Sequence, residues 1–261
     1  MSVTTSATPR HMVFAEPPVF ATTEEERLHR KQHLAAALRV FARHGFDTGV
    51  AGHITARDPG HPDRFWVNPF GVWFGQIRVS DLILVDHAGR VLEGDGLLNT
   101  AAFRIHSEIH AARPDVVAAA HAHSPYGAAW SALNRPLAPL TNEACFFFED
   151  HVIHDEPTGV TLEEVKAKAI ARSLGPHRAA VLRNHGVVTV GQTVEEAAWW
   201  FIAFEQSCRI QFLADSAGDA QCADPEDARS VRDIMGTPLA GWFSFQPLYQ
   251  QIVRDEPDLL E

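Results

Sequence analysis

The sequence predicts an α/β protein, because segments with helical and with strand periodicity alternate along the chain. Apolar residues recur at helical spacing after Thr22 and again after Asn99, whereas residues 49–93 consist of short β-rich segments separated by turn residues. A second β-rich region, residues 179–190, precedes a long apolar helix. With 261 residues, 46% hydrophobic and 21% charged, the chain has the size and composition of one large globular domain.

Charge and cysteine content argue against several classes of protein. The formal net charge is −11, from 22 basic and 33 acidic residues, and there is no run of Lys or Arg, so nucleic acid and anionic membranes are not expected as partners. Three cysteines without a CxxC spacing indicate a reducing compartment rather than a disulfide framework. Neither a membrane-spanning apolar run nor a signal-peptide core is evident, so we expect a cytoplasmic protein.

The chain is expected to begin with a flexible N-terminal arm, residues 1–21, which are rich in Ser, Thr, Pro and Ala and show no periodicity. Such an arm can also lie on another subunit. The first predicted helix begins at Thr22 or Thr23, each followed three residues later by a glutamate, as in a capping box. Gly45 suits the position just past the end of this helix.

Residues 49–93 predict three strands and a hairpin. The strands are GVAGHITARD, RFWVNPFG and SDLILVD, and DHAGR is expected to turn the chain into VLEGD. Within the second segment, NPFG (residues 68–71) predicts a bend near a strand end, where backbone N–H groups can face a ligand.

Residues 99–113 predict a second helix. Its His106 and His110 are four residues apart with Glu108 between them, but the glutamate stands one place late for the HExxH box of zinc proteases. We therefore expect His106 to be a buried core histidine and His110 a surface histidine, and not a metal pair.

A short apolar stretch, VVAAAHAHS (residues 116–124), predicts a buried strand that ends in two histidines. Because His121 and His123 are two residues apart, their side chains point to the same face of an extended strand, roughly 6–7 Å apart. Two imidazoles in this arrangement form half of a candidate metal site.

Residues 141–157, TNEACFFFEDHVIHDEP, support two interpretations. In one, the three phenylalanines form the aromatic wall of a pocket and a carboxylate lies near the metal. In the other, the segment is a buried strand followed by a solvated acidic loop. The residues alone favour neither.

The second half of the chain predicts two helices around a pair of strands. A short helix capped by Thr161 comes first. Between the strands AAVL and VVTV, Gly186 permits a tight bend that leaves His185 projecting. The long helix over residues 193–214 is too apolar for one buried face, so we expect it to contact both the core and another subunit. Residues 217–261 are expected to form a C-terminal tail that packs on a neighbouring subunit.

The order and spacing of these motifs resemble the class II aldolase/adducin superfamily. The motifs are AGHITARD, NPFG, RIHSEIHAARPDVVAAAHAHS, LRNHG and TVEEAAWWF, and the resemblance covers residues 22–216. It implies an α/β/α three-layer fold with a central, mainly antiparallel sheet, assembled as a homotetramer with sites near subunit interfaces. It also implies one divalent metal ion per subunit, held by His121, His123 and His185. Neutral imidazoles suit zinc, iron or manganese.

The sequence departs from the sugar-phosphate aldolases of this superfamily at their acid/base residue. Those enzymes carry Ser-Ser-Glu at the start of the second helix, and the corresponding residues here are Thr100, Ala101 and Ala102. An aldolase needs a positioned base to move a proton, and alanine cannot serve as one. Four side chains are candidates to replace it, from the same or a neighbouring subunit: Glu143, Glu149, His151 and Tyr249.

The phosphate site implied by the resemblance is altered too. At the matching positions His53 replaces an asparagine, Phe70 replaces a hydroxyl residue before Gly71, and Thr100 is followed by alanine instead of serine. A phosphate dianion placed against a phenyl ring would lose water without gaining donors, which is costly. We therefore expect His53, Phe70, Gly71 and Thr100 to bind a non-phosphorylated, aromatic or otherwise apolar substrate.

Three functions follow from the resemblance. The first is a metal-dependent lyase, of decarboxylase or aldolase type, that breaks a C–C bond in an oxo or hydroxy acid. The second is a non-haem iron(II) oxygenase that decarboxylates its substrate with O₂, since an absent glutamate leaves a coordination position open. The third is a non-catalytic, adducin-like interaction module, which the three retained histidines argue against.

Overall fold

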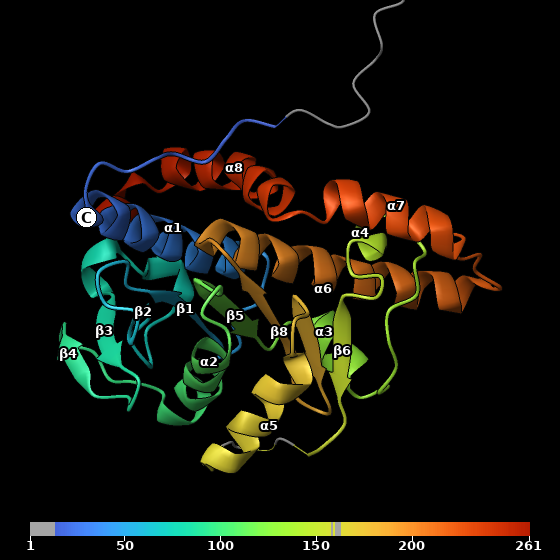
Figure 1. Ribbon diagram of the computed structural model, residues 1–261, viewed down its shortest axis with the longest axis horizontal. Helices are drawn as coiled ribbons and strands as arrows, with labels where there is room; N and C mark the ends of the chain where they lie inside the picture. Colours follow the sequence, from blue (N-terminus) through green and yellow to red (C-terminus); the bar gives the residue numbers. More distant parts are fainter. Residues whose placement is uncertain (1–13, 158, 160–162) are drawn as a thin grey trace, which may run out of the picture.

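A sheet of eight strands runs through the centre of the protein in the computed structural model, which describes residues 14–157, 159 and 163–261 (Figure 1). The strand order is β4-β3-β2-β1-β5-β8-β7-β6, and each neighbouring pair is antiparallel except β6 and β7. The strands are β1 (His53–Arg57), β2 (Arg64–Val67), β3 (Ile83–Asp86), β4 (Val91–Glu93), β5 (Ala118–Ala122), β6 (His151–His154), β7 (Ala179–Leu182) and β8 (Gly186–Gly191).

Helices cover both faces of this sheet. Helices α1 and α6 pack on one face with α7 and α8 outside them, and α2 and α5 pack on the other face (Figure 1). The helices are α1 (Thr23–Arg43), α2 (Thr100–Ala112), α3 (Pro125–Ser131), α4 (Asn142–Cys145), α5 (Glu164–Leu174), α6 (Val194–Ala217), α7 (Pro225–Met235) and α8 (Pro238–Asp255), with short 3₁₀ turns η1 (Phe74–Gln76), η2 (Val79–Asp81) and η3 (Pro257–Leu260). The predicted α/β/α fold with a mainly antiparallel sheet is confirmed.

Helix α1 begins and ends where the sequence predicts. Thr22 is the N-cap, and its hydroxyl accepts a hydrogen bond from the Glu25 backbone N–H at 3.2 Å. Just past the helix, Gly45 has a φ of 72°, a left-handed conformation that suits glycine.

Residues 14–20 of the predicted arm have no regular secondary structure and lie against helices of the same chain. The Phe14 ring contacts Phe243 of α8, and the Phe20 ring contacts His29 of α1. Residues 1–13 of the predicted arm, like the predicted cap at Thr161, lie outside the described residues.

Helix α6 is buried on two sides, as predicted, but α8 of the same chain covers its outer side. Thr193 caps α6 by accepting a hydrogen bond from the Glu196 N–H at 3.1 Å. Trp200 is fully buried, and a Cβ added to Gly241 of α8 would lie 2.6 Å from its ring. This close packing accounts for apolar surface that we assigned to a subunit contact.

Residues 217–261 form two helices rather than an irregular tail. Both helices begin at a proline, Pro225 and Pro238, because a residue without an N–H suits the first turn of a helix. Thr237 caps α8 by accepting from the Ala240 N–H at 3.2 Å. The sequence prediction described this segment only as a tail and so missed both helices. The contact of this segment with a neighbouring subunit stays a prediction.

The prediction of a surface histidine in α2 is wrong. His106 and His110 are both buried, and the hydroxyl of Thr55 in β1 lies 2.9 Å from His106 Nδ1 and 2.9 Å from His110 Nε2. Phe65 of β2 stacks on the His110 ring. The face of α2 that carries both histidines therefore packs on the sheet, with Thr55 as their shared polar partner.

Residues 141–157 match neither interpretation of that segment in full. The segment begins with the short helix α4 and ends in β6, and two of its phenylalanines, Phe146 and Phe147, lie in the core, whereas Phe148 is only partly buried. Phe147 is fully buried against Trp200 and Phe204 of α6.

No helix in the described part of the chain is both long and apolar enough to span a membrane.

A buried carboxylate after β1 ties α1 to the sheet. Asp58 accepts hydrogen bonds from Arg27 Nε of α1 at 2.6 Å and from Trp66 Nε1 of β2 at 3.0 Å. Burial alone would raise the pKa of Asp58, but the bonds from Arg27 and Trp66 hold that pKa well below its usual value.

We expect Asp58→Asn to lower the free energy of unfolding by about 2–3 kcal/mol at pH 7, because Arg27 loses a buried charged partner. A carboxylate with a lowered folded-state pKa stabilises the fold above its unfolded pKa of about 3.9, and that contribution is lost as the pH falls. The difference between variant and wild type, measured by urea unfolding, should therefore shrink below about pH 4.

Asp155→Asn is the matched control, because Asp155 pairs with Arg183 at the exposed surface. This substitution should change the free energy of unfolding by less than about 1 kcal/mol. Equal urea midpoints for Asp58→Asn and wild type at pH 7 would contradict the role given to Asp58.

Candidate metal site

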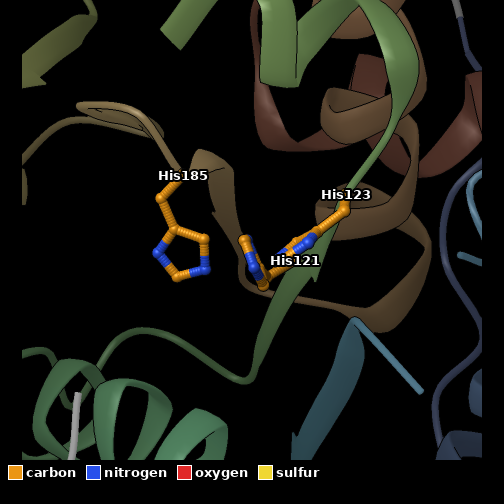
Figure 2. Close-up of side chains that lie close together, drawn as sticks. All are labelled: His121, His123 and His185. Carbon is orange, nitrogen blue, oxygen red and sulfur yellow. The ribbon is translucent and has the colours of Figure 1, made fainter. Parts of the chain in front are cut away.

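Three histidines converge where β5 ends and β8 begins (Figure 2). His121 lies in β5, His123 follows it, and His185 precedes β8. Their ring centroids are 5.2 Å apart for His121 and His123, 4.8 Å for His121 and His185, and 5.0 Å for His123 and His185. Each ring offers a nitrogen, and these nitrogens lie within 4.8 Å of one another, so the three side chains could hold one metal ion. The structure thus brings together all three predicted ligands.

One backbone contact fixes the orientation of His121. Its Nδ1 lies 2.8 Å from the carbonyl oxygen of Val187 in β8. Because a carbonyl oxygen can only accept, Nδ1 carries the hydrogen and Nε2 keeps the lone pair that a metal ion needs. The ring is therefore held in the tautomer of a metal ligand.

All three histidines are held in their neutral form. Burial lowers the pKa of His121 well below its usual value, and the neighbouring His185 lowers it further. Burial and then His123 lower the pKa of His185 to about 4. Burial also lowers the pKa of His123. Neutral imidazole is the form that binds a metal, so near pH 7 no proton has to leave before an ion enters.

Two glycines allow the backbone to come close to these ligands. Gly186 has a φ of 157°, and an added Cβ would lie 3.4 Å from His121 Cε1. Gly52, with a φ of 92°, would place a Cβ 3.1 Å from the His121 carbonyl oxygen. A larger residue at position 52 would come too close to the His121 backbone, and one at position 186 would contact the His121 ring. This agrees with the tight bend predicted at Gly186.

A small cavity lies beside His53, whose ring is near the histidine group. His53, Phe70 and Gly71, three of the four predicted substrate-binding residues, line this cavity together with Asn68 and Phe103. His53 pairs with His121 across β1 and β5, and their ring centroids are 5.9 Å apart.

His53 is the polar side chain of the cavity with the most unused hydrogen-bonding capacity. It is buried, and neither ring nitrogen has a hydrogen-bond partner of normal geometry in the described protein. Burial and the neighbouring His106 ring, 3.8 Å away, lower its pKa well below the usual value. A buried imidazole with two unpaired nitrogens is costly unless a ligand supplies the partners.

Thr100, the fourth predicted substrate-binding residue, does not line this cavity. It lies at the exposed start of α2 and borders a neighbouring surface depression with Arg104 and Glu108. Ala102 lies in the first turn of α2, where its N–H is bound by the Asn99 side chain at 3.2 Å. Position 102 thus offers no functional side chain to the site.

Comparison with known proteins decides the family. Residues 32–212 match the family described as Class II Aldolase and Adducin N-terminal domain. The chain belongs to this family. The membership predicted from the motifs is confirmed, and class II aldolases use a divalent metal, which the three neutral histidines suit.

Two relatives of this chain are similar over nearly their whole length. Decarboxylase NovR of Streptomyces niveus is 48% identical over 248 residues, covering 94% of this chain and 92% of the relative. A protein of Streptomyces roseochromogenus subsp. oscitans named 4-hydroxy-3-prenylphenylpyruvate oxygenase/4-hydroxy-3-prenylbenzoate synthase is also 48% identical, covering 94% and 90%. The structure of L-fuculose 1-phosphate aldolase from Glaciozyma antarctica PI12 superposes with a TM-score of 0.88 at 42% identity, covering 94% of this chain and 97% of that one.

Two of the candidate replacements for the aldolase base are acidic residues on the side of the chain near α7. Glu143 is exposed at the start of α4. Glu149 forms ion pairs with Arg229 and Arg232 of α7 at 2.6 and 3.2 Å. These contacts give Glu149 a structural role within its own chain, and a role for either residue in a neighbouring subunit stays a prediction.

The other two candidates are also engaged within the chain. Both ring nitrogens of His151 are used, Nδ1 at 2.6 Å from the Phe147 carbonyl and Nε2 at 3.0 Å from the Leu137 N–H. Tyr249 of α8 stacks on His33 of α1, with ring centroids 3.9 Å apart. His151 is therefore not available as a base in this arrangement.

The sequence prediction missed one residue that supports the metal ligands. Glu205 of α6 is buried, and its carboxylate accepts hydrogen bonds from the Ser124 hydroxyl at 2.6 Å and from the Tyr126 and Gly127 N–H groups at 2.8 and 2.5 Å. It fixes the turn that directly follows His123. A buried glutamate in an apolar helix was the only signal for it in the sequence.

We expect His123→Ala to lose the divalent ion held by the three histidines, because two of these histidines remain where three are needed. The metal-free variant should unfold within a few degrees of the metal-free wild type, since His123 is only half-buried. Elemental analysis of the purified protein and thermal unfolding after chelation measure the two effects. His61→Ala, at an exposed histidine, is the control and should keep its metal. A His123→Ala variant with full metal content would contradict the site.

Proposed function

We propose that the protein is an iron(II)-dependent oxygenase that decarboxylates an aromatic oxo or hydroxy acid. The observation that carries this proposal is the three-histidine group in a chain with alanine at position 102. The ligand set resembles that of the class II aldolases, while the carboxylate of their base is missing. Positions on the metal that a glutamate would occupy thus stay available to substrate and O₂.

The cavity supports a substrate that is aromatic and carries no phosphate. Phe70 and Phe103 give it ring surface, and His53 gives it hydrogen-bonding groups. An aryl ring would pack on the phenyl groups. The unpaired nitrogens of His53 suit a carboxylate or oxo oxygen next to the ring.

The residues of the chain bind and orient this substrate. When bound, iron(II) would supply the chelation of an oxo or hydroxy acid and the activation of O₂. The Val187 carbonyl keeps His121 in the ligand tautomer, and Glu205 holds the turn after His123. His53 would hold the substrate oxygen at the open side, and Phe70 would limit the access of water.

The names of the two 48% identical relatives support a decarboxylation that uses O₂. One is called a decarboxylase and the other an oxygenase and synthase acting on prenylated aromatic acids. For an arylpyruvate, one O₂ converts the 2-oxo acid to CO₂ and the hydroxy acid that is one carbon shorter. One oxygen atom enters the new carboxylate and the other enters the hydroxyl, so atoms and electrons balance without a further reductant.

A second candidate is a lyase that cleaves the C–C bond without O₂, with zinc or manganese as the metal. The 42% identity with a structure named as an aldolase favours it. The adducin-like module stays the weakest alternative, because a scaffold has no need of three convergent neutral histidines.

We further infer a cytoplasmic homotetramer with its sites near subunit interfaces. Val50, Trp73 and Leu97 support this, because they are exposed apolar side chains on the loops around the cavity. Apolar side chains gathered beside a site are typical of a protein interface.

The oxygen requirement separates the two candidates. We expect iron(II)-loaded protein to turn over 4-hydroxyphenylpyruvate or a ring-prenylated analogue with one O₂ consumed per CO₂ released, and zinc-loaded protein to be inactive. An oxygen electrode and mass spectrometry of the products measure this. Equal turnover under strict anaerobic conditions would exclude the oxygenase and support the lyase, and His123→Ala is the inactive control.

We expect His53→Phe to keep its metal but to lose about 100-fold or more in kcat/KM, because the substrate oxygen loses its hydrogen-bond partner. Steady-state kinetics beside elemental analysis test this. His87→Phe, at an exposed histidine outside the cavity, is the control. Unchanged kcat/KM in His53→Phe would mean that His53 does not contact the substrate.

A further inference from the structure

A second group of metal-binding side chains lies where α1, α6 and α8 meet. His29 and His33 are one helical turn apart in α1, and Glu195 lies in the first turn of α6. Their ligand atoms lie within 4.8 Å of one another. This group is separate from the three-histidine site, because His185 precedes β8 whereas Glu195 follows its far end.

The spacing of these atoms suits a small divalent ion. Glu195 Oε1 lies 3.0 Å from His29 Nε2 and 3.5 Å from His33 Nε2. Two ligands that bind a tetrahedral zinc ion at about 2.1 Å are about 3.4 Å apart. A modest rotation of the carboxylate is therefore enough to admit an ion between the three groups.

The orientation of His33 leaves a contact that needs a cation. Its Nδ1 lies 2.9 Å from the His29 carbonyl oxygen, so Nδ1 carries the hydrogen. In the neutral ring Nε2 then has a lone pair, and this lone pair faces the Glu195 carboxylate oxygen. With the His33 ring neutral, two acceptors face each other, and a proton or a metal ion between them would pair both.

The surroundings hold the ligands in place and leave a route for an ion. The Tyr249 ring stacks on His33, and Trp242 Nε1 donates to Glu195 Oε1 at 3.2 Å. A surface cavity lined by Phe20, His29, Glu195 and Trp242 reaches the group. His29 is partly exposed, so water can complete the shell of an ion that enters from this cavity.

We propose that His29, His33 and Glu195 bind a second divalent ion, of the zinc class, that joins α1 to α6. Two imidazoles and one carboxylate form a ligand set common to zinc and to the late first-row metals. No reacting group of the proposed function lies in the surface cavity beside it, so the role is structural. The site does not depend on the proposed function.

Zinc stoichiometry in four proteins tests the proposal. After chelation, loading with Zn²⁺ and gel filtration, we expect two ions per chain in wild type, one in His29→Gln, one in His123→Ala and none in the double variant. His61→Gln, at an exposed histidine, should keep two ions. One ion in wild type that is retained in His29→Gln and lost in His123→Ala would overturn the second site and leave the first intact.

Thermal unfolding gives an independent measurement in case a variant folds poorly. In the His123→Ala background, which lacks the first site, Zn²⁺ should raise the melting temperature, and adding His29→Gln or Glu195→Gln should remove that rise. If Zn²⁺ leaves the melting temperature of His123→Ala unchanged, the three side chains form only a hydrogen-bonded contact between α1 and α6.

Discussion

The register of β5 between β1 and β8 determines the geometry of the whole site. On one side His121 pairs with His53 of β1, and on the other Ala122 pairs with Val187 of β8. The first pairing places His53 beside the candidate metal ligand His121, and the second brings His185 close to it. A shift of one residue would turn His121 to the opposite face of the sheet, so the site exists in this register alone.

Helices can pack closely on both faces of the central strand β5 because most of its residues are small. Ala118, Ala119, Ala120 and Ala122 are fully buried in β5. These four alanines let α6 pack closely on one face of β5 and α2 on the other. The large polar side chains at this strand are therefore histidines. The metal site therefore depends on close packing in the central strand, and not only on its ligands.

Local signals in the sequence were enough to predict most elements and the shared face of His121 and His123, whereas His185 joined the candidate ligands through the family resemblance. The two-residue spacing of His121 and His123 defines a shared face, and the glycine after His185 marks a bend. The predictions that failed concern structure that depends on contacts between residues far apart in the sequence. His110 was expected at the surface because nothing near it in the chain reveals Thr55, which becomes its partner only when β1 lies under α2. The helices after residue 217 were missed because their proline starts look like linker residues.

Glu205 shows how the metal ligands depend on distant parts of the chain. The turn after His123 is followed by α3, whose N-cap Ser124 makes no side-chain cap bond, and a carboxylate from α6 satisfies its first N–H groups instead. Residues 121–124 therefore cannot take up their final shape on their own. These residues reach their final conformation only after α6, whose Glu205 lies about eighty residues later in the sequence, has packed against the sheet. An ion that binds tightly to the folded protein therefore binds only weakly to the unfolded chain. Binding of the metal thus indicates that the core has formed.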